Sequence, residues 1–273
     1  MGNMFLGFPN RIDAATLSGG SWGSTLNNLK TRSLSDVAES ADATTGSTQV
    51  IVDMGATYIV RGVATLNDNV SSAGTYAWSF GSSSGAADMG SSGTINRWRM
   101  SFDGVMRNFP GQYSSVIGYP FWAPYVHSAD VSCRYIKLAI VDTGNSLGKI
   151  RLGRIAIFGG HVPAYNMDIG ASIDTVDLTE PERSGGGAIL WQARRKYRTA
   201  EIPLSHFDAT ERGKLFEARR AAGVHEEVMF VPDVSDMPNA QEFGFVGRFK
   251  GGQQMPWSMP LKWSTTLSLE ELL

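Results

Sequence analysis

The fold of this chain is decided by Tyr135-Ile136-Lys137-Leu138-Ala139-Ile140-Val141-Asp142 and by Ile150-Arg151-Leu152-Gly153-Arg154-Ile155-Ala156-Ile157-Phe158. Both runs are rich in β-branched and other apolar residues, and the turn Thr143-Gly144-Asn145 follows the first run. This pattern predicts a pair of strands at the end of a β-sandwich. Gly159-Gly160 closes the second run. We therefore expect one domain to end there and another to begin.

Two arginines of the second run carry a further expectation. Side chains alternate between the two faces of a strand, so Arg151 and Arg154 are predicted to lie on opposite faces. At most one of them then faces solvent squarely. The other is expected at a strand end or against the second domain.

The composition is that of a globular β-protein. A chain of 273 residues is long enough for two domains, each with its own core. Charged residues make up only 18% of the chain, and 31 residues are glycine, a balance that favours strands and tight turns. The net charge of -2 provides no general attraction to nucleic acid or to anionic membranes. We expect neither nucleic-acid binding nor membrane insertion.

The chain is predicted to divide into an arm and two β-domains, so the expected fold class is all-β. Residues 1–35 are rich in Gly, Ser, Asn and Leu, and they predict an extended N-terminal arm with Trp22 as a docked anchor. Residues 36–160 predict the first β-sandwich. Residues 161–273 predict a second β-sandwich or split barrel with one helix packed on it.

The predicted helix covers about residues 209–222. Asp208 is a good N-cap, and Glu211 three residues later completes an Asp-x-x-Glu variant of the capping box. Gly223 stands where the residue that ends a helix is expected.

Catalytic and metal-binding patterns are not found in the sequence. The four histidines do not pair at ligand spacing, and no Gly-x-Ser-x-Gly elbow precedes a helix. Asn67-Asp68-Asn69 could direct oxygens at calcium, but its single carboxylate favours an ordinary turn. Cys133 is predicted to be a small buried hydrophobe. We expect no enzymatic activity, no cofactor and no metal.

Aromatic residues crowd into residues 98–125. Two interpretations stay open, because aromatics between turn residues serve both as core anchors and as surfaces that bind glycans or proteins. The candidate glycan or partner contacts are Trp98, Tyr113, Phe121, Trp122 and Tyr125.

The one basic cluster is Arg194-Arg195-Lys196-Tyr197-Arg198. In a strand, Arg194, Lys196 and Arg198 would share one face. That face would either be solvated or meet acidic groups of a neighbouring subunit. These three residues and Trp22 are the candidate subunit interface.

Several segments resemble a family of tail proteins from tailed bacteriophages and prophages. The first is Gly7-Phe8-Pro9-Asn10-Arg11-Ile12-Asp13-Ala14-Ala15-Thr16-Leu17-Ser18-Gly19-Gly20-Ser21-Trp22. Others are Asn28-Leu29-Lys30, Arg134-Tyr135-Ile136, Ile150-Arg151-Leu152-Gly153-Arg154 and Ser268-Leu269-Glu270-Glu271. The first half also resembles galactose-binding-like jelly rolls. The second half resembles the β-module of tail tube and distal tail proteins, which packs side by side into rings.

The resemblance implies a structural component of a bacteriophage virion tail, at the tail tip, assembled as a multi-copy ring of three- or six-fold symmetry. Its partners would be other tail proteins, and it would be made in the bacterial host cytoplasm and incorporated into the virion. The jelly roll leaves an alternative: a carbohydrate-binding adhesion protein that recognises host surface glycans through the jelly-roll loops.

Overall fold

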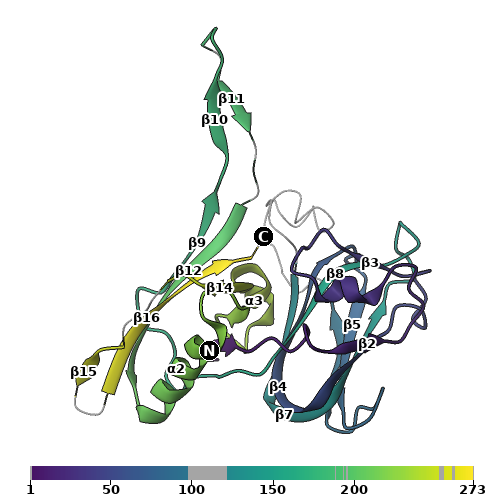
Figure 1. Ribbon diagram of the computed structural model, residues 1–273, viewed down its shortest axis with the longest axis horizontal. Coiled ribbons are helices and arrows are strands. Elements are labelled where there is room, and N and C mark those ends of the chain that lie inside the picture. Colours follow the sequence, from purple (N-terminus) through teal and green to yellow (C-terminus); the bar gives the residue numbers. More distant parts are fainter. Residues whose placement is uncertain are drawn as a thin grey trace.

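The chain is all-β, as its sequence predicts, with two domains that lie side by side (Figure 1). The computed structural model describes residues 2–97, 122–187, 189–192, 194, 196–251, 255–259 and 262–272. Every pairing between strands in these ranges is antiparallel. The segment between the domains follows the Gly159-Gly160 pair that the sequence marks as a boundary.

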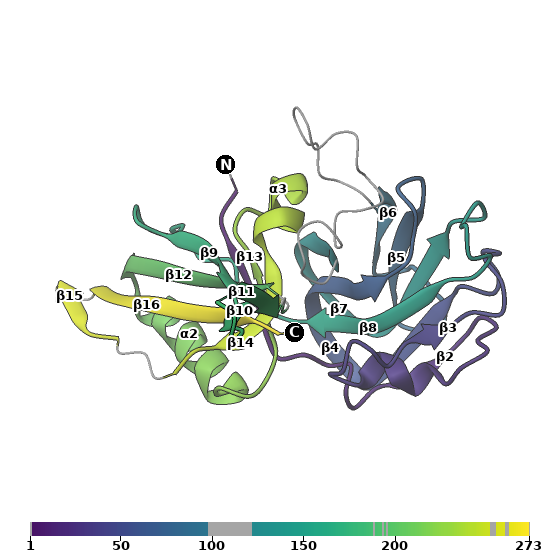
Figure 2. The same ribbon diagram turned by 90° about the horizontal axis from the view of Figure 1, so that it is seen from above.

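The first domain is one strongly bent sheet. Its strands are β2 (Thr16–Ser18), β3 (Ala38–Glu39), β4 (Val50–Asp68), β5 (Thr75–Gly81), β6 (Gly90–Asn96), β7 (Trp122–Val141) and β8 (Arg151–Phe158), and a 3₁₀ helix, η1, covers Leu26–Lys30. The order is β3-β8-β4-β7-β5-β6, with β2 paired to β4. The register of β4 and β7 shifts between Asp53 and Tyr58 and again between Val60 and Gly62. The two long strands bend there, and the sheet folds over its own core (Figure 2).

The two apolar runs, residues 135–142 and 150–158, form the end of β7 and the whole of β8, but these strands are not hydrogen-bonded to each other. β4 lies between them. The connection over residues 142–150 is much longer than a two-residue hairpin turn, so it can cross the end of β4. The strands were predicted correctly, whereas a direct pairing between them is wrong.

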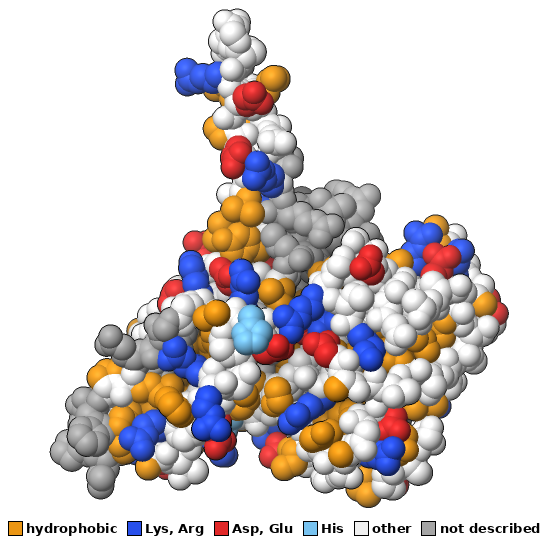
Figure 3. Space-filling model, viewed as in Figure 1, with side chains coloured by type: hydrophobic (Ala, Val, Ile, Leu, Met, Phe, Trp, Pro, Cys, Tyr) orange, Lys and Arg blue, Asp and Glu red, His pale blue; other side chains and the backbone are white. Residues whose placement is uncertain are grey.

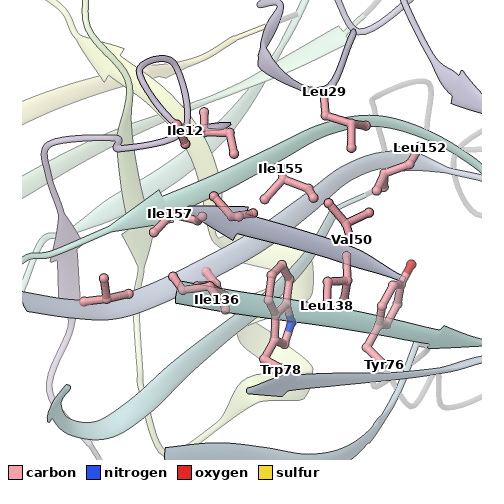
Figure 4. Packing of buried hydrophobic residues seen from close by; sticks show 14 of the residues in the cluster. Ile12, Leu29, Val50, Tyr76, Trp78, Ile136, Leu138, Leu152, Ile155 and Ile157 are labelled. Atoms are coloured by element: carbon pink, nitrogen blue, oxygen red, sulfur yellow. The ribbon is translucent and has the colours of Figure 1, made fainter. Parts of the chain in front are cut away.

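The core of the first domain lies inside this fold (Figure 4). Trp78, Ile136 and Leu138 come from one layer, and Ile155 and Ile157 of β8 meet them from the other; all five are at most 2% exposed. Cys133 belongs to the same cluster and is 1% exposed, which confirms the predicted buried hydrophobe. Burial raises the pKa of its thiol to about 11.

The second domain is a seven-stranded sheet in the order β1-β13-β14-β16-β12-β9, with β15 paired to β16. Its strands are β1 (Phe5–Gly7), β9 (Ser172–Asp177), β12 (Lys196–Phe207), β13 (Val228–Val231), β14 (Phe245–Phe249), β15 (Trp257–Met259) and β16 (Lys262–Glu271), and its helices are α2 (Ala209–Ala222) and α3 (Met237–Phe243). A separate two-stranded ribbon consists of β10 (Glu180–Arg183) and β11 (Ile189–Gln192). Helix α2 packs on one face of the large sheet, and residues of the first domain pack on the other.

Helix α2 occupies the range that its capping residues predict. The Asp208 carboxylate accepts hydrogen bonds from the backbone N–H groups of Thr210 and Glu211, and Gly223 ends the helix with φ +55°. The Glu211 carboxylate binds the backbone N–H of Ala164 at 2.6 Å, so it ties the helix to the domain connection. The short helix α3 was not predicted.

The N-terminal segment, described from residue 2 to residue 35, lies along both domains. β1 pairs with β13 and is thus an edge strand of the second domain's sheet. The chain then crosses to the first domain, where β2 pairs with β4. This path explains why the segment lacks a repeating pattern of its own, because each short piece is matched to a different neighbour.

The two domains share a buried interface. Phe5, Ala156 and Phe158 pack against Met229 and Val231 in one apolar cluster. A buried ion pair lies in the same interface: Arg154 of β8 binds Glu227, with side-chain exposures of 1% and 3% and an Nη2–Oε2 distance of 2.7 Å. Arg151 is exposed and binds Glu39. The predicted placement of the two arginines on opposite faces, one against the second domain, is confirmed.

We predict that Arg154→Ala lowers the free energy of unfolding by about 3–5 kcal/mol, because it leaves the Glu227 carboxylate buried without its partner. Urea unfolding followed by tryptophan fluorescence measures the change. Arg151→Ala, in the same strand, removes an exposed ion pair and serves as the matched control, for which we expect a small change. Equal losses for the two variants would contradict the importance of the buried pair.

A second prediction concerns His161, whose side chain is 9% exposed at the start of the second domain. Burial, and next the positive charge of Lys214, lower its pKa below the ordinary 6.5, although Glu211 opposes the shift. Between these two pKa values, His161 is protonated in the unfolded chain and neutral in the folded chain. The contribution of His161 to the free energy of unfolding is therefore fully present above about pH 6.5, and it is lost as pH drops from there toward the lowered pKa of the folded state.

His161→Gln removes this titration, so unfolding curves between pH 5 and pH 7.5 should show a weaker pH dependence for the variant. His225→Gln changes a largely exposed imidazole and is the control, for which the dependence of the parent protein should persist. An unchanged slope in His161→Gln would assign the pH dependence to other groups.

Candidate functional site

The structure describes two of the five aromatic candidates, Trp122 and Tyr125. Trp98, Tyr113 and Phe121 lie outside the described residues. Trp122 is 2% exposed, and its indole N–H donates to the backbone carbonyl of Gln241 at 2.9 Å, across the domain interface. Burial of its ring between the domains argues against a glycan or partner contact at Trp122 and favours the core-anchor interpretation. Tyr125 is half-buried against the core of the first domain.

The basic cluster is used within the chain. Lys196 of β12 binds Asp177 of β9 at 3.2 Å across the antiparallel pair, and Arg194, in the connection between β11 and β12, binds Glu180 of β10 at 2.9 Å. Arg198 is 2% exposed and forms a buried ion pair with Glu271. Arg198 therefore does not face a neighbouring subunit, and that part of the predicted interface is wrong. The cause is strand alternation, which places Arg198 on the inward face of β12.

Trp22 is held in a fixed position on the first domain. Its backbone bridges to Ser40, and its indole N–H donates to the backbone carbonyl of Gln49 at 3.0 Å. Gly20 has φ +60°, and a Cβ at this position would overlap the Ser47 carbonyl. The turn before Trp22 therefore requires glycine, and the ring is oriented by backbone contacts on two sides.

A surface hollow of about 350 Å³ lies beside this ring. We call it the Trp22 hollow; it is lined by Leu17, Gly19, Trp22, Ser24, Thr25, Leu26 and Asn27. None of these lining residues carries a charge. The Asn27 side chain is exposed and makes no hydrogen bond to any described residue, so its donor and its acceptor are available to a ligand. An aromatic ring beside neutral hydrogen-bonding groups suits a neutral, polar ligand.

The second notable surface is a hairpin that projects from the second domain (Figure 1). β10 and β11 continue the direction of β9 and β12 and pair only with each other. Along the hairpin, apolar side chains are exposed (Figure 3): Trp191 is 67%, Leu190 58% and Ile189 48% exposed. Such a surface on a projecting element marks a contact with another molecule.

Within the described ranges, no three His, Cys, Asp or Glu side chains gather as metal ligands would. Asp68, from the oxygen-rich turn, forms a buried ion pair with Arg97 at 2.8 Å. Neither helix in the described part of the chain is both long and apolar enough to span a membrane.

No protein-family model and no curated protein sequence matches the chain. Among solved structures it is similar to a fucolectin from striped bass (Morone saxatilis) serum, at 10% identity and TM-score 0.36, over 97% of this chain and 99% of that one. It is also similar to the lectin domain of lectinolysin complexed with Lewis B antigen, at 14% identity and TM-score 0.33, over 54% of this chain and 92% of that domain.

A third similar structure is a family 89 glycoside hydrolase from Clostridium perfringens, at 14% identity and TM-score 0.35. The match covers 59% of this chain but only 16% of the hydrolase. With TM-scores of 0.33 to 0.36, these three likenesses add nothing to the β-sandwich class that the strands themselves define.

Sequence patterns did not identify the polar residues of the Trp22 hollow or the exposed apolar residues of the hairpin as candidate binding residues. Ser24, Thr25 and Asn27 belong to a segment without periodicity, and only the docking of Trp22 could have pointed to them. Ile189, Leu190 and Trp191 belong to strand β11. Their exposure could not be seen, because an apolar run in a strand is ordinarily a sign of burial.

Proposed function

We propose that this chain is a non-catalytic carbohydrate-binding protein that recognises neutral surface glycans through its first domain. The Trp22 hollow carries the proposal. A sugar presents one C–H-rich face, which stacks on an aromatic ring, and a rim of hydroxyl groups, which bind neutral polar side chains. The fixed indole of Trp22 and the free carboxamide of Asn27 supply these two kinds of contact next to each other.

The absence of charge in the lining narrows the ligand class. A phosphate or an acidic sugar would call for Arg or Lys at the site, and the Trp22 hollow has neither. Because the indole is already oriented by Gln49, little side-chain freedom is lost when a ligand binds. These features support a neutral sugar and a host-surface adhesion role.

A second function is supported by a different observation. The projecting hairpin with its exposed Trp191 is what a protein that assembles in many copies requires. It supports the structural role in a bacteriophage tail tip that the sequence resemblance implies, located in the virion beside other tail proteins. Imaging of a virion that carries the chain would test this role, with a ring of copies at the tail tip as the expected result.

We predict that Trp22→Ala weakens binding of neutral mono- and disaccharides about tenfold or more, which corresponds to about 1.4 kcal/mol. The reason is loss of the stacking surface. Asn27→Ala, which changes an exposed side chain, should weaken binding as well. Glycan-array screening followed by titration calorimetry measures both effects.

The matched control is Trp191→Ala, which removes an exposed indole from the other domain. It should bind the same glycans as the parent chain. A parent chain that binds no neutral glycan would overturn the proposed function, and so would binding that Trp22→Ala and Asn27→Ala leave intact.

A further inference from the structure

The tip of the projecting hairpin is an apolar surface without cover. We call Glu180–Arg183 and Ile189–Gln192 the hairpin tip; among the described residues its two strands pair only with each other. A two-stranded hairpin by itself is marginally stable in water. With Trp191 67% exposed, this one also shows a large indole to solvent. A contact that covers the tip would bury the indole of Trp191 and would also stabilise the hairpin.

The pairing of the two strands sorts the tip into two faces. Pro181 lies opposite Trp191, and Arg183 lies opposite Ile189. Because these positions alternate with the others, they share one face, which is apolar with a single cation. Leu190 lies opposite Glu182 on the other face.

An apolar hollow of about 460 Å³ lies at the base of the same hairpin. We call it the β9 hollow, and its apolar lining includes Met167, Ile169, Ile173, Ile202, Phe230 and Phe243. Ile169 is fully exposed and Phe243 is 42% exposed. Asp168 is the one charged residue among those that line it.

The chain cannot fill the β9 hollow with its own hairpin tip. The pairing of β9 with β12 continues to Asp177 and Lys196, so the hairpin leaves the domain as an extended ribbon. Ile173 is in the hollow, and Pro181 is eight residues farther along, about 26 Å away at 3.3 Å per residue. Figure 1 shows the ribbon pointing away from the domain.

We propose that the hairpin tip binds the β9 hollow of a second copy of this chain. Trp191 and Ile189 would supply the apolar side chains, and Arg183 beside them would meet Asp168, so the charges of the two surfaces are complementary. The contact joins two different surfaces of identical chains. Such a head-to-tail contact repeats from copy to copy and closes into a ring when the rotation allows. This inference is independent of glycan binding.

The experiment measures particle mass by light scattering after size exclusion. We expect the parent chain to form particles of several 29.5 kDa copies. Trp191→Asp places a charge in the hairpin tip, and Phe243→Asp places a charge in the β9 hollow. Each variant, measured alone, should therefore be a monomer. Ile169→Asp repeats the second test at a fully exposed position, where folding is not at risk.

An equimolar mixture of Trp191→Asp and Phe243→Asp gives the sharpest result. The intact tip of one variant fits the intact hollow of the other, so the mixture should form dimers and nothing larger. A contact between two hairpin tips would instead leave Phe243→Asp alone dimeric, because both of its tips are intact. Phe216→Asp alters an exposed Phe of α2 outside both surfaces and should assemble like the parent.

A parent chain that stays monomeric at high micromolar concentration overturns the proposal. So does a monomeric mixture, or assembly that survives both Phe243→Asp and Ile169→Asp. Glycan binding by the monomeric variants is measured in parallel, and its presence or absence does not affect this conclusion.

Discussion

The buried contact between Arg154 and Glu227 is the constraint around which the two domains are arranged. Arg154 comes from the last strand of the first domain, and Glu227 lies directly before β13 of the second. Neither charge can be left alone in a buried position without a large cost. Asp13 binds the same guanidinium at 2.8 Å, and Asn10 donates to Glu227, so the N-terminal segment is drawn into the same network. This network therefore fixes the positions of the two domains and of the N-terminal segment relative to one another.

Apolar packing around this network further stabilises the contact between the two domains. β8 is buried on both faces: Ile155 and Ile157 face the core of the first domain, whereas Ala156 and Phe158 face the second domain. This explains why the run reads as continuously apolar, without the alternation of a half-exposed strand. Trp122 of β7 also stabilises the interface: its ring packs in the same apolar cluster, and its N–H donates to the backbone carbonyl of Gln241.

Local signals in the sequence were sufficient for the elements but not for their partners. The limits of α2 follow from Asp208 and Gly223, and the strand character of β8 follows from its composition. Arg154 and Glu227 are 73 residues apart, and no local pattern joins them. Strand alternation predicts that either Arg151 or Arg154 faces away from solvent, but only the folded chain shows that it is Arg154 and identifies the carboxylate that binds it. For Trp122 the sequence could not even predict burial, because the residues around an aromatic in a loop-rich segment are the same whether its ring is buried or exposed.

The shared interface also links the two surfaces that are available for binding. The Trp22 hollow belongs to the first domain and the hairpin tip to the second, and β1 and β2 of one short segment are built into the two sheets. An assembly through the hairpin would therefore present one Trp22 hollow per copy in a repeated arrangement. Weak binding of single sugars then becomes strong binding to a surface that displays many, because each later contact is intramolecular. Assembly and glycan binding are thus compatible roles for one chain, and the buried interface is what would couple them.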